Sequence, residues 1–114
     1  ARQIGLKQAM GMILTSRRVS AVEGARLGFV NEVVAAEQLQ AATMRWCAEI
    51  LRASPMSIRA SKEAVYRGLD ESGVAAAMRN QKSYPAFAAW AESDDAREGP
   101  RAFAEKRPPV WKGC

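Results

Sequence analysis

Histidine is absent from this chain of 114 residues, and cysteine occurs only twice. Without histidine the chain has no imidazole general base, no Ser-His or Cys-His nucleophile pair, and none of the ligands found in most zinc and iron sites. Cys47 and Cys114 lie far apart, and neither belongs to a CxxC motif. We therefore expect no disulfide framework and no metal site, and we expect Cys47 to be a small buried apolar residue.

Long apolar runs are also missing. The longest uncharged runs, residues 8–16 and 83–91, are much shorter than the ~20 apolar residues that cross a bilayer. The first residues show no basic region followed by an apolar stretch, as a signal peptide would. Apolar residues make up 48% and charged residues 25%, as in ordinary globular domains. We expect a cytoplasmic protein with no membrane partner.

The net charge is +5, and the basic excess gathers near the C-terminus. There, Arg101, Lys106, Arg107 and Lys112 face only Glu105. The eight aromatic residues do not form the pattern of an RNA-recognition motif. A local bias of this size favours one phosphorylated small molecule over a nucleic acid. A basic nucleic-acid binder is a third candidate class of function, beside the two given at the end of this section. Its binding would weaken steeply with salt.

Helical signals begin early in the chain. Apolar residues at helical spacing predict a helix over residues 3–14. Ser20, with Glu23 three residues later, forms a capping box that starts a short helix. Gly28 is expected to end this helix in the left-handed conformation. The β-rich residues 29–34 are expected to be extended.

The rest of the chain continues in the same way. A helix is predicted over residues 36–53, and a second one begins at the Ser54-Pro55 dipeptide and ends near residue 69. Residues 73–91 are helical by propensity, with a kink or a second start at Pro85 that Ser83 could cap. Residues 101–107 form the last helix, after a break at residues 99–100. The fold class is therefore mainly α, with five or six helices and at most one short strand.

No catalytic arrangement emerges from the residues themselves. The acidic pairs Asp70/Glu71 and Asp94/Asp95 lie at helix boundaries, where helix capping explains them. The glycines form neither a GxGxxG nor a GxxxxGK[ST] loop, and no serine has a GxSxG setting. We therefore predict no catalytic residue and no metal ligand in this chain.

Residues 93–111 fit the pattern S-x-D-x-x-E-G-x-x-A-F-x-E-K-R-x-P-x-W. This pattern closely resembles the C-terminal signature of the crotonase superfamily, the enoyl-CoA hydratases and isomerases. Residues 4–34 are similar to the family's "IG…A…LTG…SA.EA…GLVNEVV" region, so the resemblance covers essentially the whole chain. The chain departs from the pattern where Ser16 replaces Gly, Gly24 replaces Ala and Phe29 replaces Leu.

The resemblance implies a position within a crotonase-type α/β spiral fold. Residues 1–35 would end the crotonase core, and residues 36–114 would form the helical oligomerisation and CoA-lid region. The oxyanion hole and, in hydratases, two catalytic glutamates would lie upstream, so Glu23, Glu32 and Glu63 are given no catalytic role. The chain alone is therefore expected to be inactive. Because its helices would lack the sheet that they normally cover, it is also expected to expose apolar faces and to self-associate or be marginally stable.

The resemblance also implies contacts with coenzyme A. The family's Phe and Lys of the A-F-x-E-K-R motif contact the CoA moiety, and they correspond to Phe103 and Lys106. A lysine offers a mobile charge to a phosphate, and a phenylalanine covers an apolar or aromatic face. The alternative is that Phe103 anchors a core and Lys106 is a solvated charge. Trp111 is either a packing lid for the tail or a ligand contact.

The function implied is that of an enoyl-CoA hydratase/isomerase-type enzyme, a lyase or isomerase of fatty acid metabolism. Its substrate would be an acyl-CoA thioester, with hydration of a 2-enoyl-CoA the favoured reaction, and it would hold no tightly bound cofactor. Its partners would be copies of itself, in a homotrimer or a hexamer built as a dimer of trimers. The alternative is a stand-alone helical oligomerisation module without a catalytic role.

Overall fold

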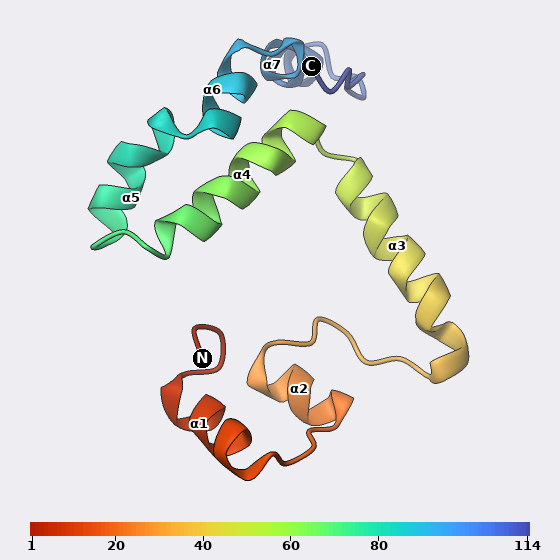
Figure 1. Ribbon diagram of the computed structural model, residues 1–114. Coiled ribbons are helices and arrows are strands. Elements are labelled where there is room, and N and C mark those ends of the chain that lie inside the picture. Colours follow the sequence, from red (N-terminus) through yellow and green to blue (C-terminus); the bar gives the residue numbers. More distant parts are fainter. The chain divides into compact units, whose positions relative to one another are not determined.

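The computed structural model describes residues 1–114 and consists of helices joined by turns and loops, without a strand (Figure 1). The predicted mainly α class is confirmed, but the number of α-helices is seven rather than five or six. Residues 29–34 pair with no other segment and form no strand. The helices are α1 (Leu6–Thr15), α2 (Ala21–Leu27), α3 (Leu39–Leu51), α4 (Pro55–Gly68), α5 (Val74–Asn80), α6 (Pro85–Glu92) and α7 (Asp94–Ala104), with 3₁₀ helices at Ala36–Gln38 and Gln81–Ser83.

The chain divides into two compact units, residues 1–44 and residues 45–114. The boundary between them falls inside α3. The helix pairs that pack most extensively, α4 with α6 and α4 with α5, both lie in the second unit. The division after residue 35 that the family resemblance implies stays a prediction.

The first unit carries the predicted helix signals. The Ser20 hydroxyl accepts a hydrogen bond from the Glu23 amide (3.2 Å), and Gly28 ends α2 with a φ of +90°. The Glu23 carboxylate pairs with the Arg17 guanidinium at 2.8 and 3.1 Å. Ser16 ends α1 in the left-handed conformation, with a φ of +52°. Such a φ strains any side chain with a Cβ, which explains why the resemblance expects glycine at this position.

We expect Ser16→Gly to stabilise the chain by about 1 kcal/mol, because it removes the cost of a left-handed residue bearing a Cβ. Urea unfolding of the two variants measures this difference. Ser83→Gly, at a residue without a positive φ, is the control, and it is not expected to stabilise. An unchanged or lower unfolding free energy for Ser16→Gly would contradict the strain at this position.

Two other departures from the family pattern compensate for each other. A Cβ at Gly24 would lie 2.8 Å from Val30 Cγ2 and 3.0 Å from two atoms of the Phe29 ring. The first distance is shorter than real Cβ atoms show, and the second is tighter than most real Cβ contacts, so the neighbouring side chain would have to shift. The larger ring of Phe29 therefore occupies the space that an alanine methyl would need. Glycine at position 24 and phenylalanine at position 29 form a matched pair in place of alanine and leucine.

This pairing predicts a non-additive double-mutant cycle. Gly24→Ala gains helix propensity of ~1 kcal/mol but overpacks the Phe29 ring, which typically costs ~1–3 kcal/mol. In a Phe29→Leu background the ring clash is gone, whereas the Val30 contact is common to both backgrounds. The cycle should give a coupling free energy of at least ~0.5 kcal/mol in unfolding experiments. Additive effects would show that the two positions are independent.

In the second unit, polar contacts fix the start of two helices. The Ser54 hydroxyl caps α4 by accepting a hydrogen bond from the Ser57 amide (3.1 Å), as predicted. The Glu63 carboxylate on α4 accepts a hydrogen bond from the Ala86 amide in the first turn of α6 (2.7 Å). The buried Tyr84 donates its hydroxyl to Glu71 (3.0 Å). Glu63 therefore connects the start of α6 to α4.

Pro85 divides the predicted helical stretch into two helices. It occupies the first turn of α6, where its missing N–H removes no helical hydrogen bond. The predicted Ser83 cap is wrong, because the N-cap residue is Tyr84 and the Ser83 hydroxyl donates to the Asn80 carbonyl (2.7 Å). The capping interpretation of Glu71 is also wrong. Gly73 precedes α5 without a side-chain cap, and Glu71 instead accepts from Tyr84 and from the Asn80 side chain.

The predicted break at residues 99–100 does not occur, because α7 continues through Pro100. The clash that proline imposes on its predecessor falls partly on that residue's Cβ, and Gly99 has none. The last helix is therefore one element that begins at Asp94 and ends at Ala104, not a separate helix over residues 101–107.

Few apolar side chains are buried. The buried hydrophobic residues are Ala9, Ala42, Met56, Ala60, Tyr84 and Ala102, and no large side chain is fully enclosed. Cys47 is exposed rather than buried, which corrects the prediction from its neighbours. None of the helices combines the length and the apolar character that crossing a bilayer requires.

Candidate functional site

The most densely connected polar residues lie on α7 and on the tail that follows it. Ser93 caps α7 by accepting a hydrogen bond from the Ala96 amide (3.1 Å). Asp95, only 2% exposed, accepts hydrogen bonds from the Ser54 hydroxyl (2.8 Å) and from the amides of Lys112 (2.8 Å) and Gly113 (3.2 Å). One carboxylate thus joins the start of α4, the start of α7 and the tail.

Burial alone would raise the pKa of Asp95, because it disfavours the charged form. The hydrogen bonds from the Lys112 amide, the Ser54 hydroxyl and the Gly113 amide outweigh burial, so the pKa of Asp95 lies below its ordinary value. The ionised carboxylate, which can only accept, is the form that suits these three donors.

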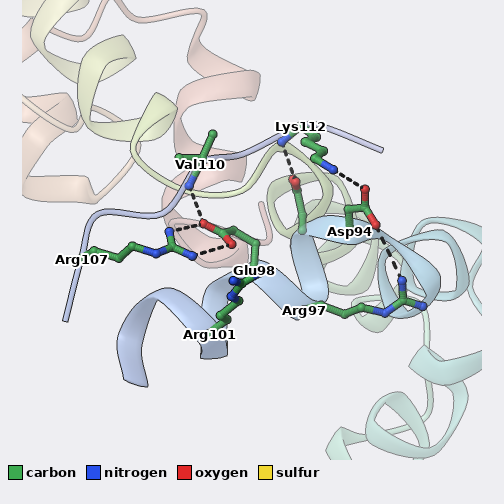
Figure 2. A pocket seen from close by; sticks show the side chains of 8 residues that line it. Asp94, Arg97, Glu98, Arg101, Arg107, Val110 and Lys112 are labelled. Carbon is green, nitrogen blue, oxygen red and sulfur yellow. Dashed lines mark hydrogen bonds and ion pairs between the residues drawn. The ribbon is translucent and has the colours of Figure 1, made fainter. Parts of the chain in front are cut away.

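Glu98, one turn further along α7, forms a second connection (Figure 2). Its oxygens accept from both terminal nitrogens of Arg107 (2.6 and 3.0 Å) and from the Val110 amide (2.8 Å). Arg107 also pairs through Nε with Glu105 (2.6 Å), which in turn pairs with Arg101 (2.9 Å). The hydrogen bond from Arg107, followed by that from Val110, lowers the pKa of Glu98 to about 2.

A hollow of about 520 Å³ lies over these residues (Figure 2). Each cation that lines it is already paired with a carboxylate: Arg97 and Lys112 with Asp94, Arg101 with Glu105, and Arg107 with Glu98 and Glu105. The charge facing this hollow is therefore largely neutralised. It is a structural junction, in which Arg107 links α7 to the tail through Glu98, whereas Arg97 and Arg101 pair with carboxylates one turn away.

Trp111 completes this junction. Its indole Nε1 donates to the Arg52 carbonyl just beyond the end of α3 (2.9 Å). A Cβ placed on Gly99 would lie 3.5 Å from its ring, so the indole lies over this glycine. Of the two interpretations of Trp111, the contacts favour the packing lid.

The turn after α7 contains Lys106 in an uncommon conformation. The Arg107 amide donates to the Ala102 carbonyl (3.1 Å), and the Lys106 amide donates to the Phe103 carbonyl (3.2 Å). These bonds define a Schellman motif with Lys106 at its left-handed position, where its φ is +53°. Glycine is the usual residue there, and a residue with a Cβ costs ~1–2 kcal/mol. Strain of this kind is found at functional sites more often than elsewhere.

The two predicted contact residues are both accessible to a ligand. Phe103 is 87% exposed on the last turn of α7, so it is not the anchor of a core within this chain. Lys106 is exposed, and no carboxylate pairs with it. Their spacing of three residues would place both on one face of a continuous helix, but this prediction is wrong, because α7 ends before Lys106.

Sequence reasoning missed what most of the signature does. It interpreted Asp95 as a capping residue and gave Glu98 no role, yet these two carboxylates hold the tail. The signal available was the pairing of Glu98 with the basic residues near position 107. The partner of Asp95, Ser54, lies 41 residues away, so no local pattern could have indicated that contact. No three His, Cys, Asp or Glu residues gather as a metal site would require.

Comparison with known proteins places this arrangement in a family. The model of the Enoyl-CoA hydratase/isomerase family matches residues 1–114, and the chain belongs to this family. A carnitinyl-CoA dehydratase of Salmonella typhi is 41% identical over 107 residues, which are 90% of this chain and 40% of that protein.

Solved structures agree with this assignment. A putative short chain enoyl-CoA hydratase from Novosphingobium aromaticivorans matches 99% of this chain with a TM-score of 0.90 and 34% identity, over 44% of its own length. An enoyl-CoA hydratase from Bacillus anthracis matches 99% with a TM-score of 0.86 and 32% identity, over 43% of its length. The chain thus spans about two-fifths of the length of these relatives.

The Glu98–Arg107 pair makes a prediction about titration. Because the folded pKa of about 2 lies below the ordinary 4.5, ionised Glu98 stabilises the folded state fully above pH 4.5. This stabilisation is lost as the pH falls from 4.5 towards 2. Carbon-detected NMR of the Glu98 carboxyl should show a midpoint near pH 2, and Arg107→Gln should move it towards 4.5. A midpoint near 4.5 in the unmodified chain would show that the pair does not form.

Proposed function

We propose that this chain contributes coenzyme A contacts and subunit assembly to an enzyme that acts on acyl-CoA thioesters, with hydration of a 2-enoyl-CoA as the reaction. It supplies no catalytic residue in this proposal. The oxyanion hole and the catalytic glutamates of the reaction are assigned to the part of the family fold that this chain does not match. The coenzyme is bound as part of the substrate, and no tightly bound cofactor is needed.

The names of the relatives support the class of reaction. A carnitinyl-CoA dehydratase and several enoyl-CoA hydratases match this chain. These names share a CoA thioester and the addition or removal of water. In such a reaction, backbone N–H groups stabilise an enolate oxyanion, and paired carboxylates handle the proton and the water.

The observation that carries the coenzyme contact is the state of Lys106. The other cations of residues 93–112 each pair with a carboxylate, whereas Lys106 is exposed and unpaired. Lys106 lies on a turn whose left-handed conformation costs free energy. Its ammonium group has no partner within the chain and is therefore suited to bind a phosphate of a ligand. Phe103, exposed three residues earlier, offers an apolar face for the adenine or the pantetheine of the same ligand.

The exposed apolar side chains support the assembly role. Leu14, Leu51 and Val74 are each more than 70% exposed, and the chain encloses no large apolar side chain. Large exposed apolar patches mark interaction surfaces. We propose that copies of the protein cover these faces in a homotrimer or a hexamer made of two trimers.

Lys106→Gly tests the coenzyme contact without damage to the turn. Glycine accepts a positive φ, so folding should become more favourable by about 1 kcal/mol. The loss of the ammonium should weaken CoA binding about tenfold, as expected for a hydrogen bond to a charged group. Isothermal titration of CoA into the complete gene product measures the affinity, and thermal melting measures the stability.

The control is Lys82→Ala, which removes another exposed lysine and should leave the affinity nearly unchanged. Phe103→Ala should also weaken binding. If Lys106→Gly and Phe103→Ala both bind CoA like the unmodified protein, the coenzyme contact is refuted. Assembly without any CoA binding would support the alternative, a helical oligomerisation module.

A further inference from the structure

Lys106 lies between two residues that ion pairs hold in place. Glu105 precedes it and pairs with Arg101 (2.9 Å) and Arg107 (2.6 Å). Arg107 follows it, and its two terminal nitrogens donate hydrogen bonds to the two oxygens of Glu98. The turn that contains Lys106 is therefore fixed on both sides by charged side chains, while Lys106 has no such partner.

Glu98 also reaches beyond this turn. One of its oxygens accepts from Arg107 (2.6 Å) and from the Val110 amide (2.8 Å), so it holds the chain at two points on the C-terminal side of Lys106. The guanidinium and the carboxylate meet through two parallel hydrogen bonds, which fixes their relative orientation as well as their distance. Without these hydrogen bonds, Arg107 would keep only its pair with Glu105 and the backbone bonds of the turn, so less would oppose relaxation of Lys106 from its positive φ.

We propose that Glu98 is a positioning residue that acts through Arg107 to keep Lys106 in the left-handed conformation from which its ammonium group binds a phosphate of coenzyme A. This inference rests on the proposed function, because it gives Lys106 the same ligand. It adds a role for Glu98 and Arg107, and it gives a reason for a lysine at a position that favours glycine.

The direction of the change in CoA affinity distinguishes the positioning role of Glu98 from a purely electrostatic effect. Glu98→Gln removes a negative charge, and for an anionic ligand charge alone predicts tighter binding. The positioning role predicts weaker binding, because glutamine cannot hold the guanidinium with two charge-assisted bonds. A purely structural role predicts a lower melting temperature, with an effect on affinity that does not depend on Lys106.

The experiment is a double-mutant cycle in the complete gene product, with CoA as the ligand and calorimetry as the readout. We expect Glu98→Gln to weaken CoA binding several-fold when Lys106 is present. In the Lys106→Gly background, the same change should have no further effect on affinity. The matched control is Glu23→Gln, which breaks an equivalent two-bond pair with Arg17 in the first unit and should leave affinity unchanged.

Arg107→Lys is the second variant, for use if Glu98→Gln does not fold. It keeps the charge but loses the two-bond geometry, and it should weaken binding only when Lys106 is present. Unchanged or tighter binding in these variants, or an equal loss with and without Lys106, would overturn the positioning role. If Lys106→Gly itself binds CoA normally, the proposed coenzyme contact fails instead, so the two failures are distinguishable.

Discussion

The hydrogen bonds that Asp95 and Glu98 accept hold the C-terminal unit in its observed form. Asp95 joins the N-terminus of α4 to the tail through Ser54, Lys112 and Gly113. Glu98 joins α7 to the segment that follows it. Both carboxylates are ionised and have lowered pKa values, because their donors favour the charged form. These contacts matter especially here because the unit buries few apolar side chains that could hold the tail.

The signature at the C-terminus therefore contains two kinds of residue. Ser93, Asp95, Glu98 and Trp111 are occupied by contacts within the chain. Phe103 and Lys106 are left exposed by the same contacts. The first group holds the tail against the helices, and the second group is accessible to a ligand. This division separates the residues that hold the turn from those that are accessible on it.

Much of the local structure follows from the sequence, because short-range rules govern it. Ser20, Gly28, Ser54 and Pro55 mark helix ends where capping and φ preferences predict them. Some errors arise where distant residues decide the outcome, and others where one neighbouring residue changes a local rule. Cys47 was expected to be buried because of its neighbours, but burial depends on packing that the chain does not supply. Gly99 lets α7 continue through Pro100, and the left-handed Lys106 ends it. The ligand candidates came from family resemblance alone, since no residue pattern distinguishes an exposed lysine that binds from one that does not.

A structure of the complete gene product with CoA bound tests the division of the signature most directly. The account predicts a CoA phosphate within hydrogen-bond distance of Lys106 Nζ, with Lys106 at a positive φ and the Glu98–Arg107 pair intact. It would be contradicted if the coenzyme lay away from this turn, with Lys106 surrounded by solvent.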